Sequence, residues 1–483
     1  MTSGQSTESP VLPPPPGPVF LVGIGGIGMS GLAQFLRWQG YAVGGSDREI
    51  SGAGRDDLYA KLRAQGIDVW PQDGAGIRAC KPALVIYSTA VEKGNPDLEA
   101  AASLPCLHRA QALAAALNRV PAKQLAVAGS CGKTSVTAWL ASALRALGVP
   151  VVTVCGGYIR EFVTERLPGN FFADSAPEWL VYEVDESDGS LVSFSPDVGV
   201  VLNIGTDHYD RPKLLELFSA CLSRCRAAGV ILDELGRELA LPEHLAIQRF
   251  APCPATDAGA AETRGNVITP ADYSASPEGI CFRLHPLPCP FFARQYGRHS
   301  ATNAAAVAAA LRTASIPCAA TTWPRAFAAF RGVARRFDYI GATSRGIAVF
   351  DDYAHNVEKI RAAIATAQEL TAGRVAIIFQ PHGFGPLTFM RDPLREALAA
   401  QLRPGDSFAL LPVYYAGGST SFQPTSEEVA ADYRQAALNA NAFPGRAAAA
   451  AFVRDGAAGA ATVLVLGARD PSLPHWCREL AGL

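Results

Sequence analysis

Short apolar runs alternate with longer, mixed stretches along most of the chain. The run PVFLV at residues 18–22 predicts a strand, and residues 29–40 predict an amphipathic helix that ends at Gly40. Residues 41–47 predict the next strand, and residues 83–90 predict a later one. Strands that alternate with helices in this way are typical of an α/β fold with mainly parallel sheets.

The alternation restarts near residues 119–123, and again after a linker-like stretch at 316–324. Residues 242–290 are rich in proline, alanine and turn formers, and they predict no clear element. The predicted parts are a disordered leader at 1–18 and three α/β domains at 19–120, 121–318 and 319–483.

Composition narrows the class of protein. Hydrophobic residues make up 49% of the 483 positions and charged residues 18%, so large buried cores are expected. A formal net charge of −2 argues against nucleic-acid binding, and no apolar run is long enough to span a membrane. The 11 cysteines include no C-x-x-C pair, and the first 18 residues lack the pattern of a signal peptide. We therefore expect a cytoplasmic protein with free thiols.

The first motif is a glycine pattern, G-x-G-x-x-G, at Gly23, Gly25 and Gly28. It lies between a predicted strand and a predicted helix, and Asp47 ends the next strand. Such glycines allow a tight turn and bring a diphosphate close to the helix N-terminus, while the carboxylate meets a ribose hydroxyl. We expect a dinucleotide or nucleotide-diphosphate site here. Tight glycine packing without a ligand is the lesser alternative.

The second motif is the phosphate loop GSCGKT at residues 129–134. In such a loop, backbone N–H groups cradle phosphates, Lys133 reaches the β- and γ-phosphate oxygens, and Thr134 binds Mg²⁺. Val127 stands where the generic pattern has its first glycine, so this loop is a shorter variant. A strand before it and a helix after it both fit a nucleoside-triphosphate site.

Three further clusters carry polar groups. Beside a phosphate loop, carboxylates at a strand end suit Mg²⁺, so Glu183 in EVDESD is favoured as a ligand over a solvated acidic turn. His208 ends NIGTDH after another buried strand, and we assign it to the same site. Arg336 in RRFDYIG precedes DDYAHN. An arginine from another domain neutralises charge during phosphoryl transfer, although paired arginines alone usually mark a solvated surface.

Together these motifs resemble those of the Mur ligases, an enzyme family that joins an amine to the carboxylate of a UDP-sugar with ATP. Within the family, the resemblance is strongest to the members that add L-alanine to UDP-N-acetylmuramate in peptidoglycan precursor synthesis. Several separated motifs in one order are far more specific than any one of them. From about residue 20 to 470 the chain carries, in the family's order, GIGGIGMSGLA, GSCGKTSVTAWL, EVDESDGS, NIGTDH, GRHSATNA, RGVARRFDYIG, DDYAHN, FQPH and PVYYAGG.

The resemblance implies a Rossmann-like domain that binds the UDP-sugar, a central P-loop ATPase with a parallel sheet, and a C-terminal Rossmann-like domain that closes over ATP and helps to bind the amino acid. The implied cofactors are ATP and Mg²⁺, and the implied partners are UDP-N-acetylmuramate and an amino acid, with the chain a monomer or homodimer. The glycine turn then holds the UDP diphosphate rather than NAD. The carboxylate is activated as an acyl phosphate, which closure protects from water.

The resemblance also assigns site residues one by one. The catalytic set is Lys133, Glu183, His208, Arg336 and His355. The ATP set is Gly129, Ser130, Cys131, Gly132, Lys133, Thr134, Ser135, His299, Asn303, Arg336 and Asp351. The UDP-sugar set is Gly23, Gly25, Gly26, Ile27, Gly28, Asp47, Ser88 and Thr89. The metal ligands are Thr134, Glu183 and His208, and the amino-acid side is His355, His382 and Arg391.

The chain departs from the family's pattern mainly near the acceptor. Cys131 stands where a histidine is usual, Gly205 replaces an acidic residue, and Asn356-Val357 replaces His-Pro. After FQPH the family has a basic stretch, whereas this chain reads GFGPL at 383–387. The acceptor therefore stays open between L-alanine, another amino acid and a recycled peptide. A nucleotide-binding paralogue without catalysis is the remaining alternative, and a dehydrogenase leaves the phosphate loop unexplained.

Overall fold

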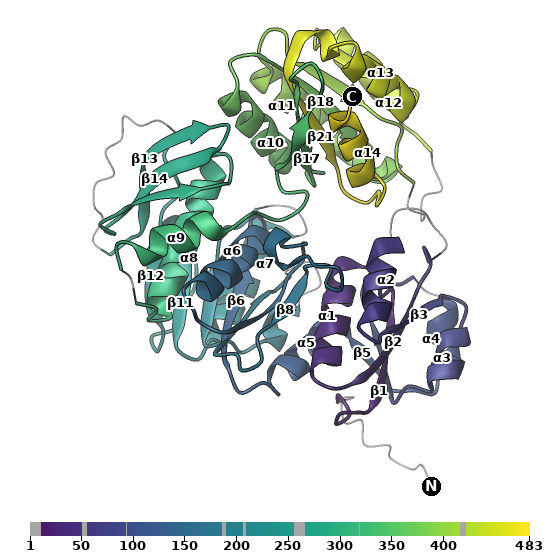
Figure 1. Cartoon of the computed structure of the whole chain (residues 1–483), viewed down its shortest axis with the longest axis vertical. Helices are drawn as coiled ribbons and strands as arrows, with labels where there is room; N and C mark the ends of the chain where they lie inside the picture. Colours follow the sequence, from purple (N-terminus) through teal and green to yellow (C-terminus); the bar gives the residue numbers. More distant parts are fainter. Residues whose placement is uncertain are drawn as a thin grey trace. The chain divides into compact units, whose positions relative to one another are not determined.

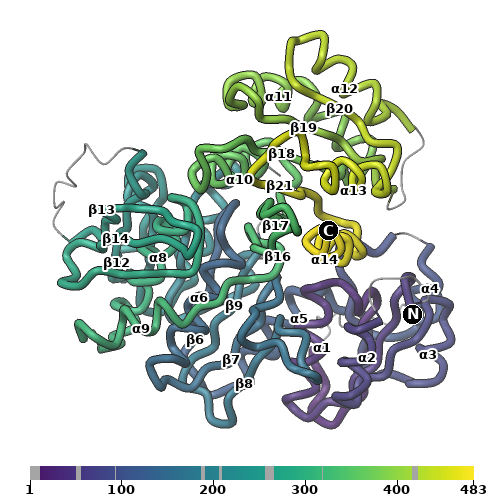
Figure 2. The backbone as a smooth tube through the Cα atoms, turned by 45° about the horizontal axis from the view of Figure 1, so that its top comes forward, coloured from purple at the N-terminus to yellow at the C-terminus, as the bar shows by residue number. Residues whose placement is uncertain are grey.

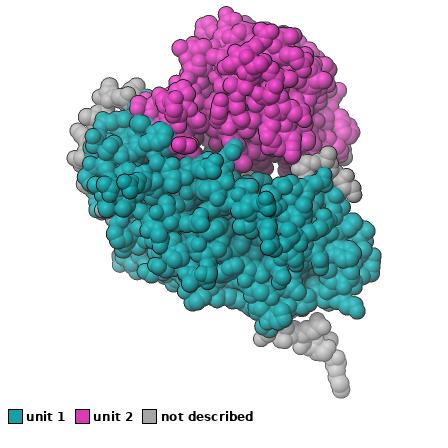
Figure 3. Space-filling model, in the orientation of Figure 1, with its two compact units in different colours: residues 1–273, 281–293, 301–333 teal, residues 274–280, 294–300, 334–483 magenta. Residues whose placement is uncertain are grey.

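The protein forms two compact units, which Figure 3 shows in teal and magenta and which are described separately. Unit 1 comprises residues 1–273, 281–293 and 301–333, and unit 2 comprises 274–280, 294–300 and 334–483. The three predicted domain boundaries stay a prediction. The computed structural model describes residues 11–50, 56–92, 94–185, 190–205, 209–255, 266–317, 319–415 and 422–483.

The first sheet of unit 1 has five parallel strands in the order β3-β2-β1-β4-β5 (Figure 1). Val19 and Leu21 of β1 pack with α1, α2 and α5, while Phe20 and Val22 pack with α3 and α4. Burial on both faces explains why this strand reads as an unbroken apolar run. The elements are β1 (Pro18–Val22), α1 (Ile27–Trp38), β2 (Ala42–Asp47), α2 (Asp56–Ala64), β3 (Asp68–Pro71), α3 (Ala75–Cys80), β4 (Leu84–Tyr87), α4 (Pro96–Ala100), β5 (Cys106–His108) and α5 (Arg109–Leu117).

The second sheet of unit 1 has seven strands in the order β12-β11-β10-β6-β9-β7-β8. Figure 2 labels β6, β7, β8, β9 and β12 of this sheet. Its strands run parallel except at one edge, where β7 and β8 are antiparallel. The elements are β6 (Lys123–Ala128), α6 (Lys133–Ala146), β7 (Val151–Val154), η1 (Arg160–Phe162), β8 (Phe171–Ala173), β9 (Trp179–Glu183), η2 (Ser190–Ser193), β10 (Val198–Val201), α7 (Arg211–Ser223), β11 (Ala228–Leu232), η3 (Asp233–Arg237) and β12 (Ala246–Phe250).

A small sheet, β13-β14-β15, follows in the chain with two helices. The buried face of α8 is almost entirely alanine, which lets neighbouring backbone approach closely. The elements are β13 (Thr269–Ser276), β14 (Gly279–His285), β15 (Pro290–Ala293), α8 (Arg298–Thr313) and α9 (Thr322–Ala329).

Unit 2 is built on a six-stranded sheet in the order β16-β17-β21-β18-β19-β20. Only the edge strand β16 runs antiparallel to its neighbour. The elements are β16 (Asp338–Ala342), β17 (Ala348–Asp352), α10 (Val357–Leu370), β18 (Arg374–Gln380), α11 (Phe384–Gln401), β19 (Ser407–Leu410), α12 (Ser426–Gln435), β20 (Ala440–Ala442), α13 (Arg446–Arg454), η4 (Ala457–Gly459), β21 (Ala460–Gly467) and α14 (Leu473–Ala481).

These sheets confirm the predicted α/β class with mainly parallel strands. Residues 242–290, which predicted no clear element, contain the whole of β12, β13 and β14. The end of the predicted disordered leader needs a correction, because Leu12 is buried and its carbonyl accepts a hydrogen bond from Arg119 (2.7 Å). Across the described residues, no helix combines the length and apolar character needed to cross a membrane.

Candidate functional site

The glycine turn of the first motif connects β1 to α1. Gly23 has φ +80°, and the N–H groups of Gly23 and Ile24 both donate to the Ser46 carbonyl at 2.8 Å. The N–H of Gly25 donates to Asp47 Oδ2 at 2.8 Å, so the buried carboxylate of Asp47 braces the turn from the end of β2. Gly26 precedes the first turn of α1 and has no side chain to cap it. The helix N-terminus thereby stays accessible to an anion.

A cavity of about 370 Å³ lies at this turn. Ser88, at the end of β4, lines it, whereas the exposed Thr89 does not contribute to the lining. Two cations that the sequence did not single out belong to the same neighbourhood. Arg48 lines the cavity, and Arg109 Nη1 would lie 3.0 Å from a Cβ atom added at Gly28. Together with the helix N-terminus, these cations suit the two negative phosphates of a UDP-sugar.

The phosphate loop connects β6 to α6. Gly129 and Gly132 have φ values of +136° and +87°, in the left-handed region that favours glycine. Lys133 is the first residue of α6, and its Nζ donates to the Gly129 carbonyl at 2.7 Å, across the mouth of the loop. Its Nζ also lies 3.8 Å from Asp185 Oδ1, so the ammonium group is held at the loop. The arrangement matches a cradle whose lysine meets terminal phosphates.

Thr134 and Glu183 are 49 positions apart in sequence and meet beside the loop. The Thr134 hydroxyl donates to Glu183 Oε2 at 2.9 Å. A Cβ atom at Gly156 would lie 1.9 Å from Glu183 Oε1, and one at Gly157 would lie 2.7 Å from Thr134 Cγ2. The two glycines after β7 therefore pack directly against both side chains and fix them. Ser135, the next residue of α6, is half-buried.

Asn203 braces the phosphate loop from the neighbouring strand, a role that the sequence did not reveal. Its Oδ1 accepts from Cys131 N–H at 2.8 Å, and its Nδ2 donates to the Cys131 carbonyl at 2.9 Å. The Ser130 hydroxyl accepts from Gly205 N–H at 2.8 Å. The NIGTDH motif thus shapes the loop through its first residues. His208, predicted as a metal ligand and catalytic residue, lies outside the described residues.

The GRHSATNA motif begins α8. Asn303 lies at the loop, because a Cβ atom added at Gly132 would come 2.9 Å from Asn303 Oδ1. His299, one turn earlier on the same helix, groups with unit 2 and has an exposed side chain. The structure therefore brings Asn303 together with the loop, while the role of His299 stays a prediction.

In unit 2, Asp351 requires a correction. We expected it on the ribose side of ATP, but its side chain is only 1% exposed and pairs with Arg335, with Nε to Oδ2 at 3.1 Å. Burial raises the pKa of Asp351 to about 6, although the positive charge of Arg335 opposes this shift. A buried, paired carboxylate is a brace for β17 rather than a group that meets a ribose. Arg336 instead lies over the Tyr353 ring, with its guanidinium carbon 5.3 Å from the ring centre.

His355 and His382 form the centre of the candidate amino-acid side. Their rings meet edge to face with centroids 5.2 Å apart, and the Tyr353 carbonyl lies 2.8 Å from His355 Nδ1. Burial, together with the nearby positive charge of Lys359, lowers the pKa of both to about 4. Arg469 adds to the effect at His382. Both imidazoles are therefore neutral at pH 7, and neutral imidazole accepts protons.

Arg391 is paired in the structure. The sequence leaves it open between a clamp for the carboxylate of the amino acid and an ordinary surface arginine. Its Nε donates to Asp432 Oδ2 at 3.2 Å, and Arg395 binds the same carboxylate at 3.1 Å. The partner of Arg391 is thus on α12, an arrangement that favours the ordinary surface arginine, and the clamp role stays a prediction. Lys359 and Arg469, which no motif singled out, are the cations that act on His382, and Lys359 and Arg336 act on His355.

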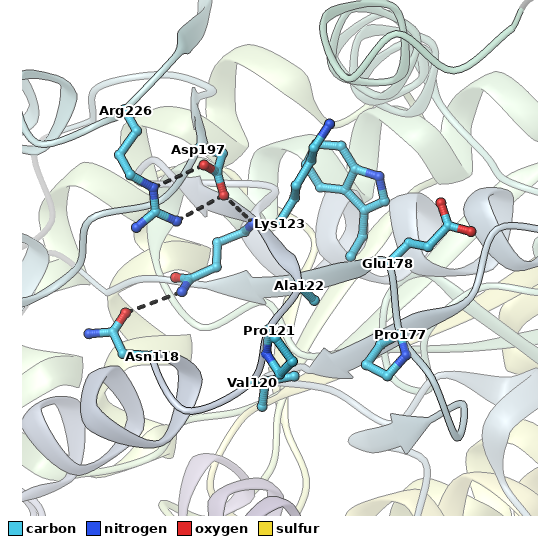
Figure 4. A pocket seen from close by; sticks show the side chains of 11 residues that line it. Asn118, Val120, Pro121, Ala122, Lys123, Pro177, Glu178, Asp197 and Arg226 are labelled. Atoms are coloured by element: carbon cyan, nitrogen blue, oxygen red, sulfur yellow. Dashed lines mark hydrogen bonds and ion pairs between the residues drawn. The ribbon is translucent and has the colours of Figure 1, made fainter.

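A separate cavity of about 620 Å³ lies at the opposite, amino-terminal edge of the central sheet (Figure 4). Its charged groups already bind one another or the chain. Arg226 donates twice to Asp197, at 2.9 and 2.8 Å, and Asp197 Oδ2 accepts from Gln124 N–H at 2.7 Å. Lys123 lies 5.6 Å from the centre of the Trp179 ring. This network stabilises the strand starts, far along the strands from the phosphate loop.

Comparisons with known proteins agree with this geometry. Residues 19–120 match the catalytic domain of the Mur ligase family, 127–220 the Mur ligase middle domain, and 335–469 the Mur ligase glutamate ligase domain. A UDP-N-acetylmuramate–L-alanine ligase of Chelativorans sp. is 32% identical over 96% of this chain and 97% of its own length. The ligase of that name from Rhizobium meliloti is 32% identical over 96% of each chain.

Solved structures show the same likeness. The crystal structure of a UDP-N-acetylmuramate–alanine ligase from Thermotoga maritima matches with a TM-score of 0.75 and 25% identity, over 96% of this chain and 97% of that one. A murein peptide ligase from Psychrobacter arcticus shares the fold, with a TM-score of 0.63 and 19% identity over 96% and 99% of the chains. The matches make this chain an ATP-dependent acid–amino-acid ligase. More narrowly, it belongs to the Mur ligase family.

Proposed function

We propose that the chain joins the carboxylate of UDP-N-acetylmuramate to the amine of L-alanine, with ATP converted to ADP and phosphate, in peptidoglycan precursor synthesis. The observation that carries the proposal is the cradle in unit 1. There Lys133 spans the glycine loop and the Thr134 hydroxyl lies 2.9 Å from a Glu183 carboxylate oxygen. The relatives named for this reaction, with matches along nearly the whole chain, support the same assignment.

On the nucleotide side, the loop N–H groups and Lys133 bind the ATP phosphates. A carboxylate oxygen of the donor attacks the γ-phosphorus, the bond to the β-phosphate oxygen breaks, and ADP leaves. Lys133 neutralises charge that spreads over the phosphate oxygens as this bond breaks. We propose that Arg336 assists from the C-terminal part of the chain.

The donor set beside the loop fits Mg²⁺. A hydroxyl and a carboxylate oxygen are hard oxygen ligands, and Mg²⁺ commonly takes one or two protein ligands besides phosphate oxygens and water. We propose that Thr134 and Glu183 hold the ion, with His208 as a third ligand. When bound, Mg²⁺ neutralises phosphate charge.

On the acceptor side, the amine attacks the carbonyl carbon of the acyl phosphate and inorganic phosphate leaves. Neutral His355 and His382 provide nitrogens that accept the proton released by the amine. Lys359 and Arg469, which lower the pKa of His382, supply positive charge for the carboxylate of the amino acid. This pair takes the place of the basic stretch that the family has after FQPH.

The test is phosphate release from ATP by the full chain, with each substrate left out in turn. We expect release to require UDP-N-acetylmuramate and L-alanine together, and the product to be their amide. Failure to release phosphate with UDP-N-acetylmuramate and any amine would remove the proposal. The same reactions in buffers with and without Mg²⁺ test the metal assignment.

A second candidate is a larger or more apolar acceptor than L-alanine. Phe384, two residues after His382, belongs to a cluster of three aromatic side chains in which Phe422 contacts the other two. Phe384 meets Phe422 edge to face with centroids 5.4 Å apart, and Tyr415 lies 5.4 Å from Phe422. Phe422 and Tyr415 are 57% and 47% exposed, so they offer apolar surface to a ligand. A panel of amino acids and short peptides, ranked by kcat/KM, decides between the two acceptors.

A further inference from the structure

One fully buried side chain joins the glycine turn of the first sheet to the metal-binding corner of the second. Asn170 follows the loop that leads into β8 and has no solvent exposure. Its Nδ2 donates to the Ile27 carbonyl at 2.7 Å and to the Ser30 hydroxyl at 2.9 Å, and its Oδ1 accepts from Gln34 at 2.9 Å. All three partners belong to α1, the helix whose N-terminus forms the diphosphate cradle.

The backbone of Asn170 continues the connection on its other side. Its carbonyl accepts from Cys155 N–H at 2.9 Å, directly after β7. The Cys155 thiol lies 3.6 Å from the Thr134 carbonyl. The next two residues are the glycines that pack without a gap against Glu183 and Thr134. Each link in this sequence is a hydrogen bond or a van der Waals contact, and the Asn170 side chain at its centre is fully buried.

The helix α1 lies unusually close to this strand pair. A Cβ atom added at Gly31 would be 3.3 Å from both the Asn170 carbonyl oxygen and Val154 Cγ1. Tight packing of this kind transmits small displacements, because neither side has space in which to relax. A shift of the glycine turn on diphosphate binding therefore moves the backbone on which Thr134 and Glu183 rest.

We propose that Asn170 is a positioning residue that couples the UDP-sugar site to the nucleotide site, so that each ligand raises the affinity for the other. The inference rests on the proposed function, since it assigns the two ligands to the two cradles. Linkage requires the same factor in both directions. The device would favour phosphate transfer only when the acyl donor is in place.

The experiment measures binding by titration calorimetry on the full chain with UDP-N-acetylmuramate and Mg²⁺-ADP, each alone and in the presence of saturating amounts of the other. In the wild type we expect a coupling factor of about tenfold. In Asn170→Ala we expect less than about twofold, with each single-ligand affinity within about threefold of the wild type. Ser30→Ala removes one acceptor of the Asn170 amide and should reduce the factor partly.

Arg166→Ala is the matched control. Arg166 Nη2 donates to the Ala64 carbonyl at 2.6 Å, so its side chain joins the same two sheet-containing parts through the end of α2. Its coupling factor should equal that of the wild type. Unchanged coupling in both Asn170→Ala and Ser30→Ala, or equal loss in Arg166→Ala, would overturn the inference. If Asn170→Ala does not fold, Ser30→Ala decides. A wild type that binds neither ligand would instead overturn the proposed function.

Discussion

The nucleotide cradle of unit 1 and the histidine pair of unit 2 are built on different principles. In the cradle, backbone groups and small residues form most of the binding surface. Glycine at 156 and 157 lets the side chains of Glu183 and Thr134 pack directly against the main chain. Around the histidine pair, isolated side chains from α10 and from the segments that follow β17, β18 and β21 supply the chemistry. The nucleotide cradle therefore tolerates almost no added side-chain volume, whereas the specificity of the histidine site can change through substitution of single side chains.

The largest expected effect is at Lys133. Lys133→Ala removes the cation that neutralises charge on the transferred phosphoryl group, so we expect kcat to fall by at least about 100-fold. Lys123→Ala is the control, because Lys123 begins the same strand, β6, at its other end. Its rate should stay within about threefold of the wild type. Equal losses in both variants would contradict the assigned cradle.

The same small substitution should act very differently in the two regions. In Gly156→Ala the new methyl group would lie 1.9 Å from Glu183 Oε1, so the carboxylate must move, and we expect kcat to fall by about 10- to 100-fold. Gly385→Ala, at the start of α11, meets no atom within 4 Å, and KM for ATP should stay within about twofold. Steady-state kinetics with ATP as the varied substrate measures both.

The histidine pair predicts a stability loss in acid. The folded pKa of His355 and His382 is about 4, below the ordinary value near 6.5, so the unfolded chain binds protons more readily. Their contribution is therefore complete above pH 6.5 and is lost as the pH falls through 4. We expect a loss on the order of 1–3 kcal/mol, and His382→Gln should reduce it. Denaturant unfolding at a series of pH values gives the free energy of unfolding; identical slopes in both proteins would refute this account.

The smallest expected effect is at Arg391. Its ion pair with Asp432 is partly exposed, so Arg391→Ala should change the free energy of unfolding by less than about 1 kcal/mol. KM for the amino acid should not change, because Asp432 already binds this guanidinium. Chemical denaturation and a KM measurement check both parts. A tenfold rise in that KM would restore the carboxylate-clamp role that the geometry argues against.

The features that the sequence predicts correctly are those formed by residues close together in the chain. The sheets' parallel strands, the Gly23 turn with Asp47, and the loop before Lys133 each leave a pattern within about 25 residues. Interactions between residues far apart in the chain, and single charged residues outside any motif, are not predicted by the sequence. No local pattern reveals the salt-bridge partners of Asp351 and Arg391, so the sequence alone predicts ligand roles for both. Arg109, Lys359 and Arg469 are single cations without a motif, and only the fold brings them to their sites.

The central claim is that ATP phosphorylates the donor carboxylate before the amine attacks. The direct measurement uses UDP-N-acetylmuramate labelled with ¹⁸O in its carboxylate, together with ATP and the amino acid. Transfer of one labelled oxygen to inorganic phosphate in each turnover is the result that we predict, because the bond between the carbonyl carbon and that oxygen breaks when the amine attacks. Phosphate that carries no label, formed alongside the amide product, would contradict the account.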